Sequence, residues 1–436
     1  MIDEMMNFTT AIDFAEHPMN NTKTKWKRKY YLALEYFVKA SVSDEYAISR
    51  LEQYKRKFFG NTKITDTEVK IEKVVYAIVN SRYHPGRKKY RYWLMCDIAL
   101  ILADEHLIDQ TAKEMQKFMT KHQWEKLDIL IQTLKGEDKV DYKSIVFAMN
   151  LMQQYRKNSN FNKKQIRRFI VTANMSAGKS TLINALIGKP LTRTSQEVCT
   201  GNLSYLYNKP FEDGRIHLKN NTFTLEASPN DLANISWEYK THIASFFRVM
   251  NENAHRLCII DTPGVNSAIN RQHGKISREA LKNEQYEKVL YILNANKLGT
   301  DEEIAHLKWI SENIQKEKII FILNKLDDFK AADDNIDISL SRVKNDLAIL
   351  GFDSPIICPM CAYFALLIKM KLYGDQLTDD ELDDYALYIR KFNRPMHDLS
   401  KYYNGIQVEP DDSEAVKMSK RCGLYGLEKI LFGGAQ

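Results

Sequence analysis

The sequence contains no apolar run long enough to cross a membrane. Its longest apolar stretches, 74–79 and 94–103, are much shorter than the roughly 20 residues that a membrane-spanning helix requires. Proline is scarce, with 10 residues in 436, and 44% of the residues are hydrophobic. This composition excludes a collagen-like or disordered chain and predicts a folded protein of two or three domains.

Cysteine is also sparse, with six residues, and only Cys358 and Cys361 are closely spaced. So few cysteines exclude a disulfide-built scaffold, and we interpret the close pair as ordinary loop residues. The N-terminal sequence MIDEMMNFTT lacks a basic leader followed by an apolar stretch, so nothing marks the chain for secretion. The expected location is cytoplasmic, with peripheral contact to a membrane left open.

Basic residues are unevenly distributed along the chain. Residues 1–168 contain 31 Lys and Arg against 21 Asp and Glu, whereas the rest of the chain contains 32 against 35. The excess is concentrated in 23–29 (KTKWKRK) and 82–91, where basic and aromatic residues alternate. Such segments can bind acidic lipid headgroups or nucleic acid, and a solvated helix face without a partner is the alternative that we favour slightly. Of the two polyanions, an acidic membrane is the preferred partner and RNA the less favoured one.

Two regions with different periodicity follow each other. Between residues 23 and 160 apolar residues recur at helical spacing, which predicts an all-helical region. From about residue 165 short apolar runs alternate with helices, which is typical of an α/β domain with a mostly parallel sheet. The predicted strands are 169–172, 257–260, 289–293, 319–323 and 356–358. A hairpin is expected where 214–218 and 222–225 flank Asn220-Asn221.

Five parts result from this division. They are a flexible N-terminus (1–22), the all-helical region (23–160), the α/β domain (165–370), a helical acidic insertion (371–420) and a final helix (421–436).

The first predicted strand leads into a phosphate-binding pattern. Residues 173–180, ANMSAGKS, fit G-x-x-x-x-G-K-[ST] except that Ala173 replaces the first glycine. In such a loop backbone amides point at phosphate oxygens, Lys179 reaches the β- and γ-phosphates, and the Ser180 hydroxyl binds Mg²⁺. A helix is expected over 179–187, ending at Gly188. The candidate nucleotide contacts are Asn174, Met175, Ser176, Ala177, Gly178, Lys179, Ser180 and Thr181.

Two further motifs also follow predicted strands. In Asp261-Thr-Pro-Gly264 the carboxylate can hold a Mg²⁺ water and the glycine amide can meet the γ-phosphate. In 324–327, NKLD, the Asp327 carboxylate can accept hydrogen bonds from two adjacent donors of guanine that adenine does not offer. We therefore add Asn324, Lys325 and Asp327 to the candidate nucleotide contacts, and we expect GTP or GDP with Mg²⁺ as the ligands.

The chain resembles the dynamin-like GTPases, in particular the bacterial members. The similar segments are MSAGKSTLINALIGKPL, CIIDTPGVNS, VLYILNANKLGTDEEIAHLKWI, PIICPMCAYFALL and CGLYGLEKIL, which together cover roughly 168–370 and 422–431. The resemblance implies that 165–370 is a P-loop GTPase domain that hydrolyses GTP, and that 421–436 is a helix that closes it.

The resemblance also implies roles for individual residues. Thr200 is the switch-I threonine that holds Mg²⁺ and the attacking water, so Ser180, Thr200 and Asp261 are the metal candidates. Ser176 matches a position in the family's phosphate loop, and Lys179, Ser176 and Thr200 are the catalytic candidates. Cys361 lies in the loop that contacts the base.

One departure from the family concerns the attacking water. Met175 stands where eukaryotic dynamins have a glutamine that helps to position water, and a thioether cannot donate a hydrogen bond. The family overcomes slow hydrolysis by pairing GTPase domains, so the resemblance implies self-association.

The favoured hypothesis is a GTP-hydrolysing switch or assembly protein whose helical region transmits the nucleotide state. A soluble regulatory GTPase that acts on a protein or RNA partner is one alternative. A scaffold that binds GTP without hydrolysing it is the other, and Ala173 and Met175 favour it.

Overall fold

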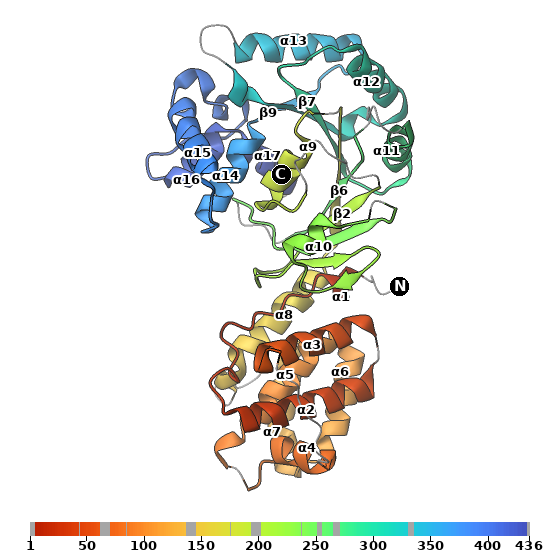
Figure 1. The fold of residues 1–436 in the computed structure, drawn as a ribbon, viewed down its shortest axis with the longest axis vertical. Helices are drawn as coiled ribbons and strands as arrows, with labels where there is room; N and C mark the ends of the chain where they lie inside the picture. The colour runs from red at the N-terminus through yellow and green to blue at the C-terminus, as the bar shows by residue number, and fades with distance from the viewer. Residues whose placement is uncertain are drawn as a thin grey trace. The chain divides into compact units, whose positions relative to one another are not determined.

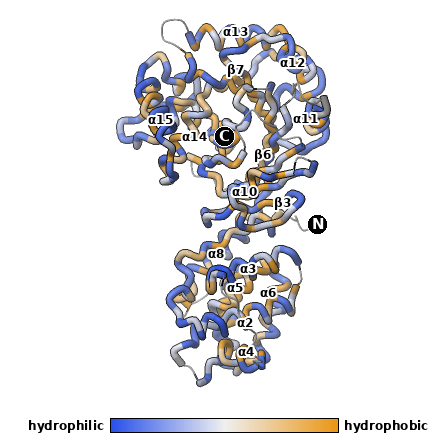
Figure 2. Tube along the Cα trace, viewed as in Figure 1, coloured by the Kyte–Doolittle hydropathy of each residue, from blue (hydrophilic) through white to orange (hydrophobic). Residues whose placement is uncertain are grey.

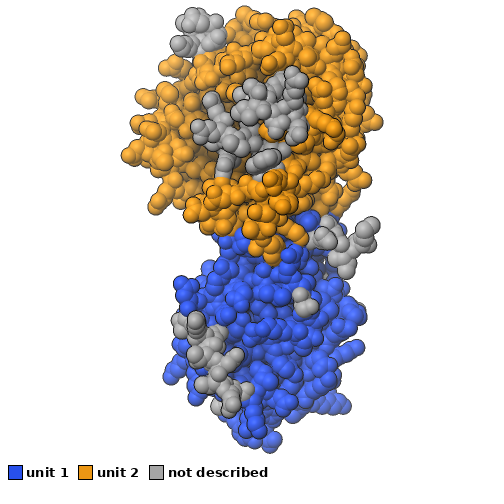
Figure 3. Space-filling model, turned by 45° about the vertical axis from the view of Figure 1, so that its right-hand side comes forward, with its two compact units in different colours: residues 1–164, 209–215, 224–226 blue, residues 165–208, 216–223, 227–436 orange. Residues whose placement is uncertain are grey.

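The computed structural model describes residues 5–42, 44–61, 70–83, 85–136, 145–174, 176–192, 202–236, 238–250, 255–264, 271–329 and 335–433. The chain forms two compact units, which Figure 3 shows in different colours. The first unit comprises 1–164, 209–215 and 224–226, and the second comprises 165–208, 216–223 and 227–436.

The first unit is helical. Its helices are α1 (Met5–Phe8), α2 (Thr24–Ser41), α3 (Glu45–Phe59), α4 (Ile71–Val79), α5 (Tyr90–Leu102), α6 (Glu105–Gln116), α7 (Lys121–Leu134) and α8 (Met149–Asn162), seen in the lower part of Figure 1. All residues of α5 except Trp93 are buried, and α2, α3, α6 and α8 pack against it. A helix that is apolar on every side belongs in the centre of a bundle. The helical region predicted from the spacing of apolar residues is confirmed.

A fully buried carboxylate lies at the centre of this bundle. Asp97 of α5 accepts hydrogen bonds from the hydroxyls of Tyr30, at 2.6 Å, and Tyr54, at 2.9 Å. His17 Nε2 lies 3.0 Å from the same carboxylate. Because His17 Nδ1 accepts from the backbone N–H of Met19, the proton of a neutral ring would be on Nε2 and would point at Asp97. Both carboxylate oxygens are therefore satisfied by protein groups.

The N-terminal segment corrects one expectation. Residues 5–22, expected to be flexible, are packed into the bundle, with Phe8 and Phe14 buried. The side chain of Asn158 in α8 exchanges two hydrogen bonds of 2.8 Å with the backbone of Ala11. These side-chain hydrogen bonds satisfy backbone groups that no regular helix or strand pairs. The segment is therefore ordered although its sequence has no extended helical or strand periodicity.

Two short segments from within the α/β sequence belong to the helical unit. In 209–215 the Lys209 ammonium is buried against Asp213 at 2.5 Å. The Asp213 carboxylate also accepts from the backbone N–H of Ile12, and the Arg215 guanidinium lies 4.7 Å from the ring centre of Phe14. The chain between two strands of the second unit is thus anchored in the first.

The described part of the second unit is organised around a nine-stranded sheet with the order β4-β3-β5-β2-β6-β1-β7-β8-β9. The strands are β1 (Ile166–Ala173), β2 (Ser204–Asn208), β3 (His217–Lys219), β4 (Phe223–Thr224), β5 (Thr241–Ser245), β6 (Arg256–Asp261), β7 (Lys288–Asn294), β8 (Ile319–Asn324) and β9 (Ile356–Pro359). β1 pairs in parallel with β6 and β7, β7 with β8, and β8 with β9, whereas β2 runs antiparallel to β6. Figure 2 shows apolar residues along the central strands β6 and β7.

The α/β prediction is confirmed, and each of the five predicted strands lies within an observed one. β2 (SYLYN) and β5 (THIAS) were not predicted, because polar residues limit their apolar runs to three residues or fewer. The predicted hairpin turns at Asn220, whose N–H donates to the carbonyl of Thr222 at 2.9 Å. Its strands are shorter than expected, and residues 209–215 and 224–226 at their outer ends belong to the helical unit.

The helices of the second unit are α9 (Lys179–Ile187), α10 (Pro229–Ala233), α11 (Arg271–Asn283), α12 (Asp301–Asn313), α13 (Ile336–Ile349), α14 (Ala362–Leu372), α15 (Asp379–Phe392), α16 (Glu414–Arg421) and α17 (Leu424–Phe432). α14 and α17 both pack against α9. A fully buried ion pair of 2.6 Å joins Lys369 of α14 to Glu428 of α17, and Lys369 also donates to the carbonyl of Leu186. This cation lies at the negative end of the α9 dipole, which stabilises the arrangement. In the described part of the chain, no helix has the length and apolarity that a membrane crossing demands.

Candidate functional site

The loop between β1 and α9 has the backbone of a phosphate cradle. Ser176 has a φ of 64° and Gly178 a φ of 90°, both in the left-handed region. A Cβ atom at Gly178 would overlap the side-chain nitrogen of Asn324, so only glycine fits there. Asn174, Ser180 and Thr181 of the same loop and helix are half-buried, and Ala177 is buried. Met175 lies outside the described residues.

Lys179 and Asp261 meet at the end of β6. The Lys179 ammonium donates to Asp261 Oδ1, and the two side chains are 12% and 1% exposed. The second carboxylate oxygen, Oδ2, is buried and has no hydrogen-bond partner among the described residues. A buried unpaired carboxylate oxygen is costly unless a ligand completes it. A hard cation or its water would satisfy Oδ2, so this position fits Mg²⁺.

The chain that leaves α9 is fixed by one buried amide. Asn184 Oδ1 accepts from the backbone N–H of Leu191, at 3.0 Å, and of Thr192, at 2.8 Å. Its Nδ2 donates to the carbonyl of Thr192 at 2.9 Å. The predicted switch begins after this point, and Thr200 lies outside the described residues. Gly264, whose backbone amide is predicted to contact the γ-phosphate, lies within the described residues and is buried.

Asn324 connects two loops of the site. Its Nδ2 donates to the carbonyl of Ala177 at 3.0 Å, and its Oδ1 accepts from the backbone N–H of Ala362 at 3.0 Å. The side-chain amide thus joins the phosphate loop to the first residue of α14. Asn324 is one of the predicted nucleotide contacts, and these two bonds already engage both polar atoms of its side-chain amide with the protein.

Asp327 lies in a short 3₁₀ turn that follows Lys325, whose φ is 68°. Burial is the main cause that raises the pKa of Asp327, and a hydrogen bond from the Cys361 thiol opposes this. Burial also raises the pKa of Cys361 well above its usual range, which keeps the thiol protonated and able to donate. Cys361 therefore lies beside the Asp327 carboxylate. It forms no disulfide, as is true of every cysteine that the structure describes.

Three residues near the site were not predicted. Asn294, at the end of β7, donates to the carbonyl of Ser176 at 3.3 Å. Asn296 donates to the carboxylate of Asp328 at 2.8 Å, and the Tyr388 hydroxyl donates to Asp327 Oδ2 at 3.4 Å. The signal for Asn294 is an amide that directly follows an apolar strand, as Asn324 does. Tyr388 offers no such signal because it lies 61 residues from Asp327.

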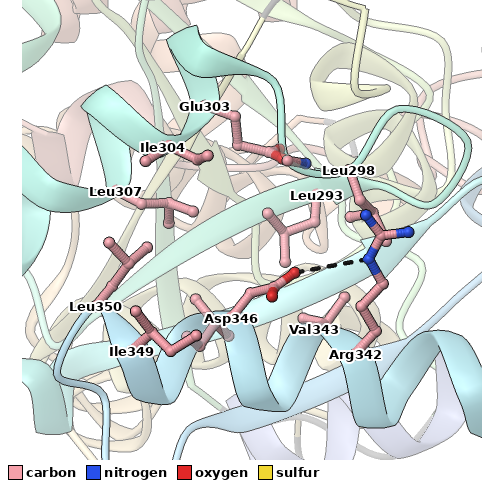
Figure 4. Close-up of a pocket in the computed structure, with 12 residues that line it drawn as sticks. Leu293, Leu298, Glu303, Ile304, Leu307, Arg342, Val343, Asp346, Ile349 and Leu350 are labelled. Atoms are coloured by element: carbon pink, nitrogen blue, oxygen red, sulfur yellow. Dashed lines mark hydrogen bonds and ion pairs between the residues drawn. The ribbon is translucent and has the colours of Figure 1, made fainter.

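A separate pocket of about 300 Å³ lies between α12 and α13, and Figure 4 shows its lining. The lining is mostly aliphatic, with Leu293 at its centre, and its acidic groups are Glu303 and Asp346. Two carboxylates would repel a triphosphate, and Arg342 is the single basic residue of the lining and pairs with Asp346 at 3.9 Å. This pocket is therefore not the phosphate site.

The arrangement defines a class of protein. A left-handed phosphate loop between β1 and α9, a lysine paired with the aspartate that ends β6, and a second aspartate in the turn that follows β8 together describe a P-loop domain that binds guanine nucleotides.

Comparison with known proteins shows which family the nucleotide-binding part of the chain is similar to. Residues 170–326 match the sequence model of the dynamin family. A curated relative, "Probable transmembrane GTPase FZO-like, chloroplastic" from Arabidopsis thaliana, is 26% identical over 203 residues, which is 46% of this chain and 20% of that protein. Residues 170–326 are therefore assigned to a GTPase domain of the dynamin-like type. The chain spans about a fifth of the length of the relative that it matches.

Solved structures were compared as well. Toc33 from Arabidopsis thaliana, in complex with GDP and Mg²⁺, is 16% identical over 50% of this chain and 77% of its own, with a TM-score of 0.30. The G domain of the T. maritima FeoB iron transporter is 14% identical over 51% of this chain and 99% of its own, with a TM-score of 0.26.

Proposed function

We propose that this protein binds GTP with Mg²⁺, hydrolyses it, and uses the nucleotide state to control its helical unit. The observation that carries the proposal is the buried Lys179–Asp261 pair, whose unpaired Oδ2 oxygen faces no protein donor among the described residues. A lysine held beside a strand-end carboxylate suits a site where a triphosphate and a divalent cation bind together.

The residues divide into three roles. Lys179 and the loop amides hold the phosphates, which spreads the negative charge that develops during phosphoryl transfer. Ser180 and Asp261 hold Mg²⁺, together with Thr200 and phosphate oxygens.

The remaining residues select the base. Asp327 accepts the two adjacent donors of guanine, and Cys361 keeps the carboxylate in place. Lys325 covers the base, and Asn324 braces the phosphate loop against α14.

Coupling to the helical unit is supported by the segment 209–215. It follows β2 directly, and β2 follows the chain that contains Thr200. Its contacts lie within the helical unit: Asp213 accepts from the backbone N–H of Ile12, and Arg215 lies over the ring of Phe14. A conformational change in the chain that contains Thr200 would therefore be passed through β2 to 209–215, which is part of the helical unit.

We further propose a peripheral contact between the helical unit and an acidic membrane. The two basic segments noticed in the sequence meet at Trp26, with the Lys29 ammonium 4.8 Å and the Arg87 guanidinium 3.9 Å from its ring. Burial, Lys25 and Arg87 together lower the pKa of Lys29, which indicates crowded positive charge. An anionic surface would relieve this repulsion.

The experiment is GTP turnover by the full chain with Mg²⁺, compared with Lys179→Ala. We expect the variant to bind GTP at least about 100-fold more weakly, because the lysine offsets phosphate charge in a buried site. Since the variant leaves Asp261 unpaired, the double variant Lys179→Ala, Asp261→Asn is the control: it should regain stability but not binding. GTP bound by Lys179→Ala with the affinity of the native chain would exclude this phosphate site.

The same assay tests self-association. Met175 cannot donate a hydrogen bond to water, so we expect slow turnover by monomers that rises with protein concentration as GTPase domains pair. Constant specific activity over a hundredfold range of concentration would reject pairing. Turnover that rises with acidic liposomes but not with RNA would identify the polyanion.

A further inference from the structure

Helix α15 (Asp379–Phe392) lies in 371–420, the predicted acidic insertion, and not in the predicted GTPase domain 165–370. Its first turn contains Asp379, Asp380 and Glu381, and its last turn contains Arg390 and Lys391. This helix nevertheless contacts the turn that contains Asp327, at two points one turn apart on its surface, through Tyr388 and Lys391. Residues three apart on a helix share one face, so both side chains can reach the same loop.

Lys391 holds the backbone of this turn. Its ammonium donates to the carbonyl of Asp327 and, at 2.5 Å, to the carbonyl of Phe329. The turn begins at Lys325 in a left-handed conformation and ends at Phe329, which is buried. The Lys391 ammonium thus binds two backbone carbonyls of the turn that carries the Asp327 side chain.

Tyr388 contacts the carboxylate itself. Its hydroxyl donates to Asp327 Oδ2 at 3.4 Å. Burial, with the nearby Asp327 charge, raises the pKa of Tyr388, so its hydroxyl keeps its proton and remains a donor. The Tyr388 ring lies 5.5 Å from the ring of Phe364 and 6.1 Å from that of Tyr363, both in α14. The donor is therefore fixed by packing against a helix of the GTPase core.

We infer that α15 is a specificity element, in which Tyr388 and Lys391 are positioning residues that aim the Asp327 carboxylate at guanine. The inference rests on the proposed function, because it assigns no base contact of its own. A carboxylate that accepts two adjacent donors must lie in their plane, and a rotated or displaced carboxylate keeps one bond and loses the other. The exocyclic amine of guanine is the donor whose contribution can be measured separately, because inosine lacks it.

The experiment measures the affinities of the full chain for GTP, ITP and inorganic triphosphate. In Tyr388→Phe and Lys391→Met we expect the preference for GTP over ITP to fall about 3- to 10-fold, the range for one hydrogen bond of ordinary strength. Affinity for inorganic triphosphate, which has no base, should not change. Lys391→Arg should restore most of the preference because it restores a cationic donor.

Two control variants come from the same helix. Arg390→Met removes an exposed positive charge next to Lys391, and Tyr385→Phe removes a hydroxyl one turn before Tyr388. Both should keep the native preference. If Lys391→Met does not fold, Tyr388→Phe decides the question, because it removes a single oxygen.

The outcomes separate this inference from the proposed function. A native chain that does not bind GTP would reject the proposed function. A native chain that prefers GTP over ITP through Asp327, with the same preference in Tyr388→Phe and Lys391→Met, would reject the role of α15 alone. A loss of triphosphate affinity equal to the loss of GTP affinity would show general damage to the site and would also overturn the inference.

Discussion

The two units each contain a buried aspartate, and the two side chains are satisfied in different ways. Asp97 in the helical unit is 0% exposed and is contacted by Tyr30, Tyr54 and His17. Asp261 in the GTPase unit is 1% exposed, yet only Lys179 donates to it, and Oδ2 has no partner among the described residues. A saturated carboxylate stabilises a scaffold, whereas an incompletely satisfied one is stabilised by what binds to it. Burial alone does not distinguish them, but the hydrogen bonds do.

The largest expected effect comes from the saturated network. Asp97→Ala leaves two tyrosine hydroxyls and an imidazole buried without their acceptor, so the free energy of unfolding of the helical unit should fall by about 3–5 kcal/mol. Denaturant unfolding measures it. The control is Asp109→Ala, whose side chain is 41% exposed and pairs with Lys135, and whose loss should remain below about 1 kcal/mol. Equal losses in both variants would mean that the network adds no stability.

Asp261→Asn should behave in the opposite way. We expect turnover of GTP to fall about 10²–10³-fold, because an amide cannot supply the charge that holds Mg²⁺. The free energy of unfolding without nucleotide should fall by less than in Asp97→Ala, because the Lys179 ammonium that loses its partner is 12% exposed and can be hydrated. Steady-state turnover and denaturant unfolding measure the two effects. A stability loss as large as that of Asp97→Ala would make Asp261 a scaffold residue and remove the contrast.

Asp327→Asn should shift the base preference from guanine toward xanthine. GTP affinity should fall about 10- to 100-fold and xanthosine triphosphate should gain, because an amide can donate to the additional carbonyl of xanthine. Competition binding measures both. If neither affinity changes, guanine is selected elsewhere.

Because the pKa of Asp327 is raised, GTP affinity and the free energy of unfolding should both depend on pH. Burial raises this pKa in the folded protein, so on acidification the carboxylate gains its proton above the usual 3.8 and GTP affinity falls with it. In the nucleotide-free protein the sign is reversed: the free energy of unfolding falls as the pH rises from 3.8 to the raised pKa, because the folded state binds the proton more tightly. Asp327→Asn should remove both dependences.

The smallest effect is expected at the surface of the helical unit. Replacing Lys23, Lys25, Lys27, Arg28 and Lys29 by Gln should weaken binding to acidic vesicles about tenfold if one or two of the five touch headgroups, and should reduce its dependence on salt. The control replaces five other lysines of the unit: Lys57, Lys113, Lys117, Lys121 and Lys126. Vesicle sedimentation at several salt concentrations measures the difference. Equal behaviour of the two variants would support a solvated helix face.

The nucleotide loops were predictable because each is a local pattern. Strand, loop and helix occur consecutively around Gly178, and helix α9 has the predicted bounds. The acidic motifs at Asp261 and Asp327 each follow an apolar strand directly, and parallel strands bring such ends to one edge of the sheet. By contrast, the order of residues 5–22 depends on Asn158, which is 147 positions away from Ala11. No local sequence pattern can predict such a hydrogen bond.

The sequence by itself determined the fold class, the helical region and the three motifs, because these depend on periodicity and on neighbours within a few residues. Only the tertiary structure decided which polar groups are already satisfied. It joined Asn324 to Ala177 and Ala362, placed Tyr388 and Lys391 beside Asp327, and left one oxygen of Asp261 without a described partner. The physical reason is that hydrogen bonds in a folded core join groups far apart in sequence, and their directions are set by packing and not by composition.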